Sequence, residues 1–176
     1  AGAGTTTAGL AFGGIGPGST MAVSTEEFGG SSWTSGGNLN TARRYLGGFG
    51  IQTAALAVSG AEPSLSTLVE QYNGSSWTEI AEVNTARREL SGSGTTTAGL
   101  AFGGKDSSET GKTESWNGTS WTEVNDLSTA RSRLAGATPA PSTESLAFGG
   151  TDGSSDQSAT EEFTADDFQI KTVTQS

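Results

Sequence analysis

The chain has 176 residues, a formal net charge of −10, and neither histidine nor cysteine. The acidic charge argues against a nucleic-acid partner, because affinity for a phosphate backbone comes largely from clustered Lys and Arg. Without cysteine there is no disulfide and no reactive thiolate, and without histidine the commonest metal ligand and general base are missing.

The composition also bears on where the protein works. The chain has no apolar run of the length that spans a membrane, about 18 residues, so we expect no membrane insertion. Only 16% of the residues are charged, and Ser, Thr and Gly fill much of the surface instead. This composition is typical of an extracellular or virion-associated β protein. The chain begins at Ala1, which indicates a processed protein or part of a longer one.

The sequence contains internal repeats. The stretch TTTAGLAFGG occurs unchanged at residues 5–14 and 95–104, with variants at 54–60 and 144–150. The repeat period is 44 to 46 residues. A period of this length, with several short strand patterns closed by glycine, is typical of propeller blades. The sequence therefore predicts one all-β domain, residues 1–176, that forms a β-propeller of four four-stranded blades. The blades lie at approximately 1–42, 43–86, 87–130 and 131–176.

Each repeat contains four predicted strands. The innermost ones, at 1–4, 45–50, 89–94 and 134–138, are rich in small residues, which suits the crowded axis of a propeller. The second strands carry the Leu-Ala-Phe-Gly-Gly motif, whose paired glycines predict a bulge or a turn with positive φ. The third strands end in an aromatic residue, and the outermost strands begin with one. These residues are Phe28, Tyr72, Trp116 and Phe163 in the third strands, and Trp33, Trp77, Trp121 and Phe168 in the outermost ones.

Two Asn-Gly pairs, Asn73-Gly74 and Asn117-Gly118, lie between a third and an outermost strand. They predict tight hairpins with type I′ turns, in which both central residues have positive φ. Each pair also begins an N-glycosylation sequon. The sequence alone leaves the use of these sequons open.

The order of these motifs resembles kelch β-propellers over nearly the whole chain. A strand ending in Gly-Gly is followed by a Glu-containing strand, a Trp-led strand and an Arg before the next Gly-rich strand. The segments WNGTSWTE and NTARR are similar to those of tandem kelch-like repeats in marine bacteriophage and environmental proteins. The fourth unit departs from the pattern, with FTADDFQI in place of the Trp-led strand and no Arg segment after it.

The resemblance implies four whole blades without a strand shared between the two ends. Closure of the ring then depends on the packing of blade faces. Either four blades close on themselves, or the unit is open and joins a second copy or upstream repeats of the same protein. We favour the self-closed ring.

All arginines lie in three short segments, each of which directly follows a Thr-Ala pair. We expect one arginine of each segment to form an ion pair between blades, because its planar fork can bind a carboxylate and a backbone carbonyl together. The residues assigned to these pairs are Arg43, Arg87 and Arg131 with Glu26, Glu70 and Glu114.

The remaining arginines lie in places comparable to those that ring one mouth of the channel in kelch propellers that bind acidic peptides. The resemblance therefore implies an anionic ligand there. The loops between second and third strands differ between repeats, and they emerge on the same face as the arginine segments. We predict this face as the binding surface, unless the loops have simply drifted. Its residues are Arg44, Arg88 and Arg133 near the centre, with Asp106, Glu109, Asp152 and Asp156 at the rim.

We expect no enzymatic activity, no cofactor and no metal. Copper chemistry of the galactose oxidase kind needs His ligands and a Cys-Tyr crosslink, and sialidase-like hydrolysis needs an arginine triad with Asp-box turns. The loops at 105–109 and 151–156 do not match a calcium-binding loop of the EF-hand type. The predicted function is recognition of a protein or glycan, as a module of a phage tail fibre or a secreted adhesin. The alternative is an architectural protein of a particle or filament with no small ligand.

Overall fold

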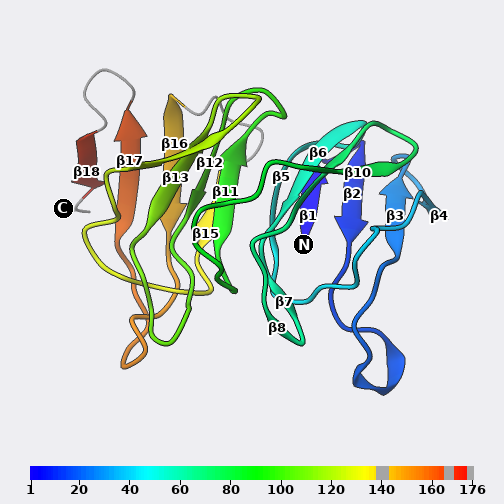
Figure 1. Cartoon of the computed structure of the whole chain (residues 1–176). Coiled ribbons are helices and arrows are strands. Elements are labelled where there is room, and N and C mark those ends of the chain that lie inside the picture. The colour runs from blue at the N-terminus through cyan, green and yellow to red at the C-terminus, as the bar shows by residue number, and fades with distance from the viewer. Residues whose placement is uncertain (138–142, 165–168, 174–176) are drawn as a thin grey trace.

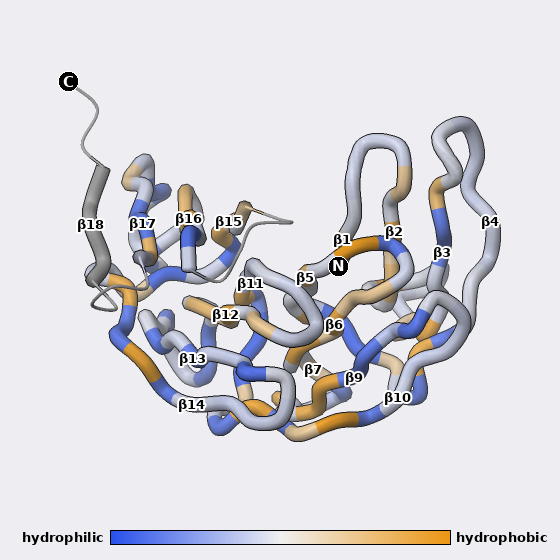
Figure 2. The backbone as a smooth tube through the Cα atoms, turned by 90° about the horizontal axis from the view of Figure 1, so that it is seen from above, coloured by the Kyte–Doolittle hydropathy of each residue, from blue (hydrophilic) through white to orange (hydrophobic). Residues whose placement is uncertain are grey.

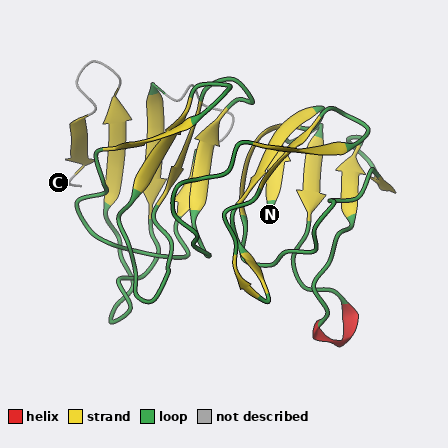
Figure 3. Ribbon diagram, viewed as in Figure 1, coloured by secondary structure: helices red, strands yellow, loops and turns green. Residues whose placement is uncertain are grey.

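The computed structural model describes residues 1–137, 143–164 and 169–173, with side chains up to residue 164. Within these ranges strands and connecting loops make up the molecule, apart from the short 3-10 turn η1 (Pro17–Ser19) (Figure 3). No helix in the described part of the chain has the length and apolar character needed to cross a membrane.

The strands form four antiparallel sheets of four strands each (Figure 1). The first blade contains β1 (Gly2–Gly4), β2 (Gly9–Phe12), β3 (Thr25–Phe28) and β4 (Trp33–Ser35). The second contains β5 (Gly47–Ile51), β6 (Ala54–Val58), β9 (Val69–Tyr72) and β10 (Trp77–Ile80). The third contains β11 (Ser91–Gly94), β12 (Gly99–Phe102), β13 (Thr113–Trp116) and β14 (Trp121–Val124).

The fourth blade contains β15 (Ala135–Gly136), β16 (Glu144–Phe148), β17 (Thr160–Thr164) and β18 (Gln169–Val173). A short hairpin of β7 (Ala61–Glu62) and β8 (Ser64–Leu65) lies in the loop between β6 and β9. Each blade runs from its innermost to its outermost strand in chain order. The predicted all-β propeller with four blades is confirmed, while the predicted start of the last strand at Phe168 lies outside the described residues.

The hairpins at the Asn-Gly pairs are present, but their predicted turn type is wrong. Tyr72 pairs with Trp77, so the loop has four residues instead of two. Gly74 has a φ of 90°, whereas Asn73 is not among the residues with positive φ. The Asn73 side chain accepts hydrogen bonds from the amides of Ser75 and Ser76 at 3.0 and 2.9 Å. Because this side chain satisfies the turn's amides, the asparagine need not adopt the left-handed conformation.

The paired glycines after the second strands have positive φ, as predicted. Gly103 and Gly104 have φ values of 64° and 106°. A Cβ at Gly103 would lie 2.7 Å from the carbonyl oxygen of Arg131. Glycine is therefore required here both by the backbone conformation and by the close approach of the next arginine segment.

The hydrophobic core consists of three layers, each between consecutive blades. In the first layer Phe12 and Leu10 of β2 pack against the second blade, where Trp77 lies 4.8 Å from Phe12 between ring centroids. The ring of Phe12 covers Gly48, and a Cβ added at Gly48 would lie 2.5 Å from its Cζ atom. Small residues in the innermost strands thus allow the aromatic ring of the preceding blade to approach the backbone.

In the second layer, a phenylalanine from a different strand covers the innermost glycine. The second blade has Val58 where the first and third have Phe12 and Phe102. Phe49 of β5 fills the space instead, and a Cβ added at Gly92 would lie 2.4 Å from its ring. A phenylalanine thus covers a glycine of the next innermost strand in this layer as well.

The four blades lie along an open arc (Figure 2). Innermost strands of consecutive blades contact one another, from β1 to β5, from β5 to β11 and from β11 to β15, whereas no contact of that extent joins β15 to β1. Trp33 of the first blade is 52% exposed, and Phe148 of the fourth is 41% exposed. The expected self-closed ring is therefore not formed in the described part of the chain, because these two faces do not pack on each other.

Candidate functional site

The first arginine of each segment is buried in a joint between two blades. Arg43 lies in the connection from β4 to β5, and its Nη2 donates to Glu70 of β9 at 3.0 Å. Its Nη1 donates to the carbonyls of Ser59 and Leu68 at 2.8 and 2.6 Å. Burial lowers the pKa of Arg43, and the attraction of Glu70 opposes that shift. Arg43 therefore locks the second blade to the segment that follows the first.

The same arrangement recurs in the next two joints, where Arg87 lies 3.1 Å from Glu114, and Arg131 pairs with Glu161. The prediction that Glu26 is one of the three carboxylate partners is wrong. Each arginine pairs with the third strand of the blade that follows its own segment, and in this chain no arginine segment precedes Glu26. Glu26 is exposed, and Glu161 takes the third pair. These buried arginines are engaged and do not offer a binding group.

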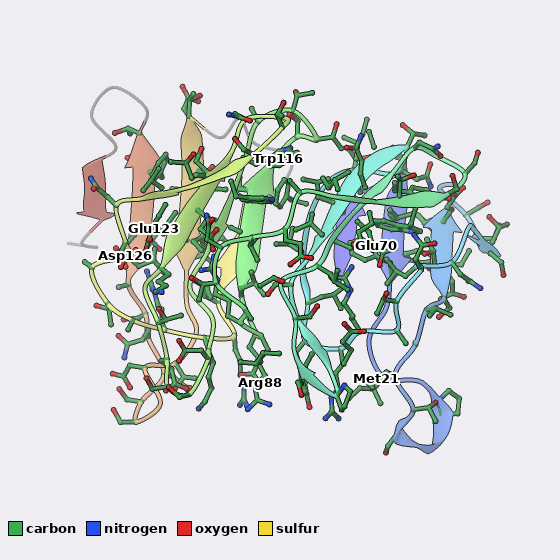
Figure 4. The ribbon with its side chains drawn as sticks, in the orientation of Figure 1. Met21, Glu70, Arg88, Trp116, Glu123 and Asp126 are labelled. Carbon is green, nitrogen blue, oxygen red and sulfur yellow. The ribbon has the colours of Figure 1, made fainter. Side chains whose placement is uncertain are left out.

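The second arginine of the first two segments lies beside a loop between second and third strands. The backbone of Arg44 exchanges hydrogen bonds with Ala61 at 3.1 and 2.9 Å, and Arg88 does so with Lys105 at 3.0 and 2.8 Å. The arginine segments and these loops therefore share one face, as the sequence predicts. Figure 4 shows Arg88 at the lower edge of the molecule, where these loops emerge.

The next position in each repeat has an unusual backbone conformation. Tyr45, Glu89 and Arg133 have φ values of 57°, 58° and 56°, in the left-handed region. Backbone hydrogen bonds connect them in series, with Glu89 donating to Tyr45 at 2.7 Å and Arg133 donating to Glu89 at 2.8 Å. A left-handed conformation costs about 1 to 2 kcal/mol for a residue with a Cβ. The cost falls repeatedly on bulky or charged residues at one mouth of the propeller, which makes this mouth a candidate site.

The guanidinium groups of Arg44 and Arg88 both lie against the ring of Tyr45, at 5.3 and 5.9 Å from its centroid. Tyr45 is 41% exposed, and both arginines are half-buried. Neither arginine forms an ion pair within the described part of the chain. We call these three residues the arginine–tyrosine cluster.

Arg133 differs from Arg44 and Arg88, with which we predicted it to act, because it occupies the repeat position of Tyr45 and Glu89. Its side chain is exposed and donates to Glu89 at 2.9 Å. The hydrogen bond to Glu89 raises the pKa of Arg133. The structure thus brings Arg44 and Arg88 together on Tyr45 but engages Arg133 with a neighbouring carboxylate.

The predicted rim acids mostly hold their own loops. Asp106 accepts from the amide of Ser108, and hydrogen bonds of this kind lower its pKa. Asp152 accepts from Ser154, which lowers its pKa to about 2. Their carboxylates therefore stabilise the turns of their own loops.

The other two rim acids lie close to these loops. Glu109 pairs with Lys105 at 2.8 Å, and that contact lowers the pKa of Glu109. Asp156 lines a surface pocket with Arg133 and Gln157. Among the residues that the structure describes, no three acidic side chains are placed to hold a metal ion.

Sequence reasoning missed Tyr45 and Glu89. Both directly follow a pair of arginines and occupy equivalent repeat positions, which was the available signal. Their role depends on the left-handed backbone, which turns the side chain toward the neighbouring blade, and a residue's position in the sequence does not reveal that conformation.

The channel behind this mouth is lined by the innermost strands. A cavity of about 260 Å³ is bordered by small residues that include Gly2, Gly48, Gly92 and Gly136. These residues offer no charged side chain, so the charged groups of this region lie at the mouth.

Comparison with protein-family models and with curated protein sequences gives no match to the chain.

Proposed function

We propose that this protein is a non-catalytic recognition module that binds an anionic group at the arginine–tyrosine cluster. The observation that supports the proposal is the pair of half-buried guanidinium groups on one exposed aromatic ring. No acidic side chain of the described residues neutralises them.

Electrostatics favours an external anion at this place. The chain carries an excess of negative charge, with 19 acidic and 9 basic residues, and it nevertheless leaves these two cations without a carboxylate. Two like charges against one ring repel each other, and partial burial weakens the screening by water. An anion between them removes this repulsion. The planar guanidinium also matches the geometry of carboxylate, sulfate and phosphate groups.

The arginines also retain unused hydrogen-bonding capacity. The Nε atoms of Arg44 and Arg88 are buried, and no protein acceptor reaches them. A buried donor without an acceptor costs about 1 to 3 kcal/mol. A bound oxyanion that reaches the guanidinium edge would satisfy such donors, and Tyr45 would cover an apolar part of the ligand.

The partner in this proposal is an acidic segment of a protein or an acidic glycan. The resemblance of the repeat sequence to kelch-like repeats supports the proposal that this module belongs to a phage tail fibre or a secreted adhesin. The lack of histidine and cysteine in the sequence supports a role in binding rather than catalysis.

The test is a calorimetric titration with two probes, a polyglutamate peptide and a polyuronate oligosaccharide. We expect at least one probe to bind, with an affinity that falls as salt is added. Replacing both arginines, Arg44→Gln with Arg88→Gln, is expected to weaken binding by about tenfold or more, which corresponds to about 1.4 kcal/mol. The control is Arg133→Gln, which removes one positive charge from the same mouth, as each of the two arginine changes does, but from a guanidinium that is already paired with Glu89. If neither probe binds, or if the control weakens binding as much as the double variant, the proposal is wrong.

A further inference from the structure

The two ends of the arc carry the two halves of one interface. We call the side of a blade that packs on the following blade its outgoing face, and the side that packs on the preceding blade its incoming face. Inside the chain, an outgoing face packs on an incoming face three times. The fourth blade has an outgoing face with no described blade on it, and the first blade has an incoming face in the same state (Figure 2). The same repeat positions that are buried in the joints are exposed here.

The outgoing face of the fourth blade repeats that of the first. Phe148 of β16 stands where the first blade has Phe12, and the two side chains are 41% and 2% exposed. Leu146 is half-buried, whereas its equivalent Leu10 is buried. This face thus offers an aromatic ring and a leucine side chain in the arrangement that the internal joints bury.

The incoming face of the first blade repeats that of the second. Trp33 is 52% exposed, while its equivalent Trp77 is 5% exposed. Trp33 already packs on Phe28, with ring centroids 5.3 Å apart, much as Trp77 packs on Tyr72 at 4.9 Å. The aromatic pair is therefore formed before any partner binds.

The slot for the incoming ring is also present. In the first joint, the ring of Phe12 covers Gly48 of the innermost strand. Gly2 is the equivalent of Gly48, because it pairs with Ala11 as Gly48 pairs with Ala57. Among the described residues, the only atom within 4 Å of a Cβ added at Gly2 is the carbonyl oxygen of Leu10 in its own blade, so no described ring occupies this slot.

A polar contact completes the match. In the first joint, Nε1 of Trp77 donates to Oγ1 of Thr25 at 2.9 Å. Thr25 pairs with Phe12 in the sheet, and Thr160 pairs with Phe148 in the same way. The fourth blade therefore has a threonine where the indole of Trp33 requires an acceptor.

We propose that a second copy of this chain occupies each free face. Phe148 of one copy covers Gly2 of the other, against Trp33, and Trp33 donates to Thr160. The contact is head-to-tail, so a second identical contact closes a ring of two copies. Such a ring has eight blades, which is within the usual range of about four to eight, whereas three copies would exceed it.

One feature of the internal joints is missing from this contact. The joints inside the chain each contain a buried arginine paired with a third-strand glutamate, and Glu26 has no such arginine in either copy. We therefore expect a reversible dimer whose population depends on concentration. This inference does not depend on the anion-binding proposal, since it uses other residues.

The first experiment is sedimentation velocity over a range of concentrations. The expected result is a dimer, with twice the 17.7 kDa mass of one chain. Trp33→Ser and Phe148→Ser are each expected to give monomers, and both residues are exposed enough for the fold to survive. The control is Ile51→Ser, which removes a side chain that is 45% exposed at the end of β5 in the second blade, which carries neither free face. A monomer at every concentration, or a dimer that survives both variants, overturns the proposal.

The second experiment fixes the direction of the contact. Because the chain lacks cysteine, Gly2→Cys and Phe148→Cys can be made as single variants, mixed and treated with a short bismaleimide crosslinker. A crosslink between the two different variants is expected, while each variant alone remains uncrosslinked. The pair Phe12→Cys with Gly48→Cys in one chain calibrates the geometry, since those residues already touch. When Gly2→Cys and Phe148→Cys are combined in one chain, a crosslink within a single chain would show that the four blades close on themselves and would overturn the two-copy ring. Polydisperse larger assemblies would overturn it as well.

Discussion

The guanidinium of Arg43 lies 3.0 Å from the carboxylate of Glu70, and both side chains are essentially inaccessible to water, at 0% and 1% exposed. The carboxylate also accepts from the backbone amide and the side chain of Asn40, at 2.7 and 2.9 Å. One glutamate of the second blade thus holds the whole connection from the first. The equivalent contacts of Glu114 with Asn84 show that this is a property of the repeat.

The ion pair of the second joint predicts a large asymmetry between two charge-removing variants. Arg87→Ala leaves Glu114 buried without its arginine, and we expect a loss of about 3 kcal/mol or more in the free energy of unfolding. Lys112→Ala removes a cation that donates to the Thr85 hydroxyl and forms no ion pair with a described residue, so a change within about 0.5 kcal/mol is expected. Denaturant titration of both variants measures the difference. Equal midpoints would show that the pair does not stabilise the joint.

The glycine beneath the aromatic ring gives a second prediction. Gly48→Ala places a Cβ 2.5 Å from the ring of Phe12, so the ring must move out of the joint, and overpacking of this kind costs about 1 to 3 kcal/mol. Gly29→Ala is the control, because a Cβ there meets nothing within 4 Å. Thermal unfolding of the two variants tests the prediction. If both unfold together, the close approach of blades does not require the glycine.

The left-handed backbone at the mouth gives a third prediction. Tyr45→Gly and Tyr45→Ala both remove the ring, but only glycine relieves the positive φ of 57°. We expect the glycine variant to be more stable than the alanine variant by about 1 kcal/mol. Both variants should bind the anionic probes more weakly than the unmodified protein if the cluster is the binding site. An alanine variant that is as stable as the glycine variant would contradict the strain.

The buried Tyr72 gives a prediction for alkaline pH. Burial, with a further contribution from its hydrogen bond to Glu27, raises the pKa of Tyr72 above its usual 10.0. The folded protein holds this proton more tightly than the unfolded chain does. The resulting stabilisation is therefore complete below pH 10.0 and is lost as the pH rises through the higher folded pKa.

Tyr72→Phe should remove this dependence. Its unfolding free energy should change less between neutral and strongly alkaline pH than that of the unmodified protein. Taking the difference between the two proteins cancels the titration of groups that they share. Parallel pH profiles would show that Tyr72 does not ionise in the transition.

The sequence by itself determined the repeat and its blade. Glycine pairs such as Gly103-Gly104 indicate positive φ, because glycine has no Cβ to strain that conformation. Short apolar strands such as residues 99–102, which are buried throughout, can bury that surface only between sheets. The first arginine after each Thr-Ala pair could also be linked to a third-strand glutamate from the sequence. A residue type that is repeated at fixed spacing makes the same contact in each blade. The prediction was wrong by one blade, because it included Glu26 of the first blade in place of Glu161 of the fourth.

The tertiary structure decided which of these repeated residues remain available. Arg44, Arg88 and Arg133 lie close to one another in the repeat, yet two of them lie against Tyr45 and the third pairs with Glu89. Arg133 differs because it occupies the left-handed position of Tyr45 and Glu89, one residue beyond the other two arginines. Trp33 and Trp77 are equivalent in the repeat, but only one is covered. Burial depends on what stands across the interface, and for the first and last blades of an open arc that information is not contained in the repeat.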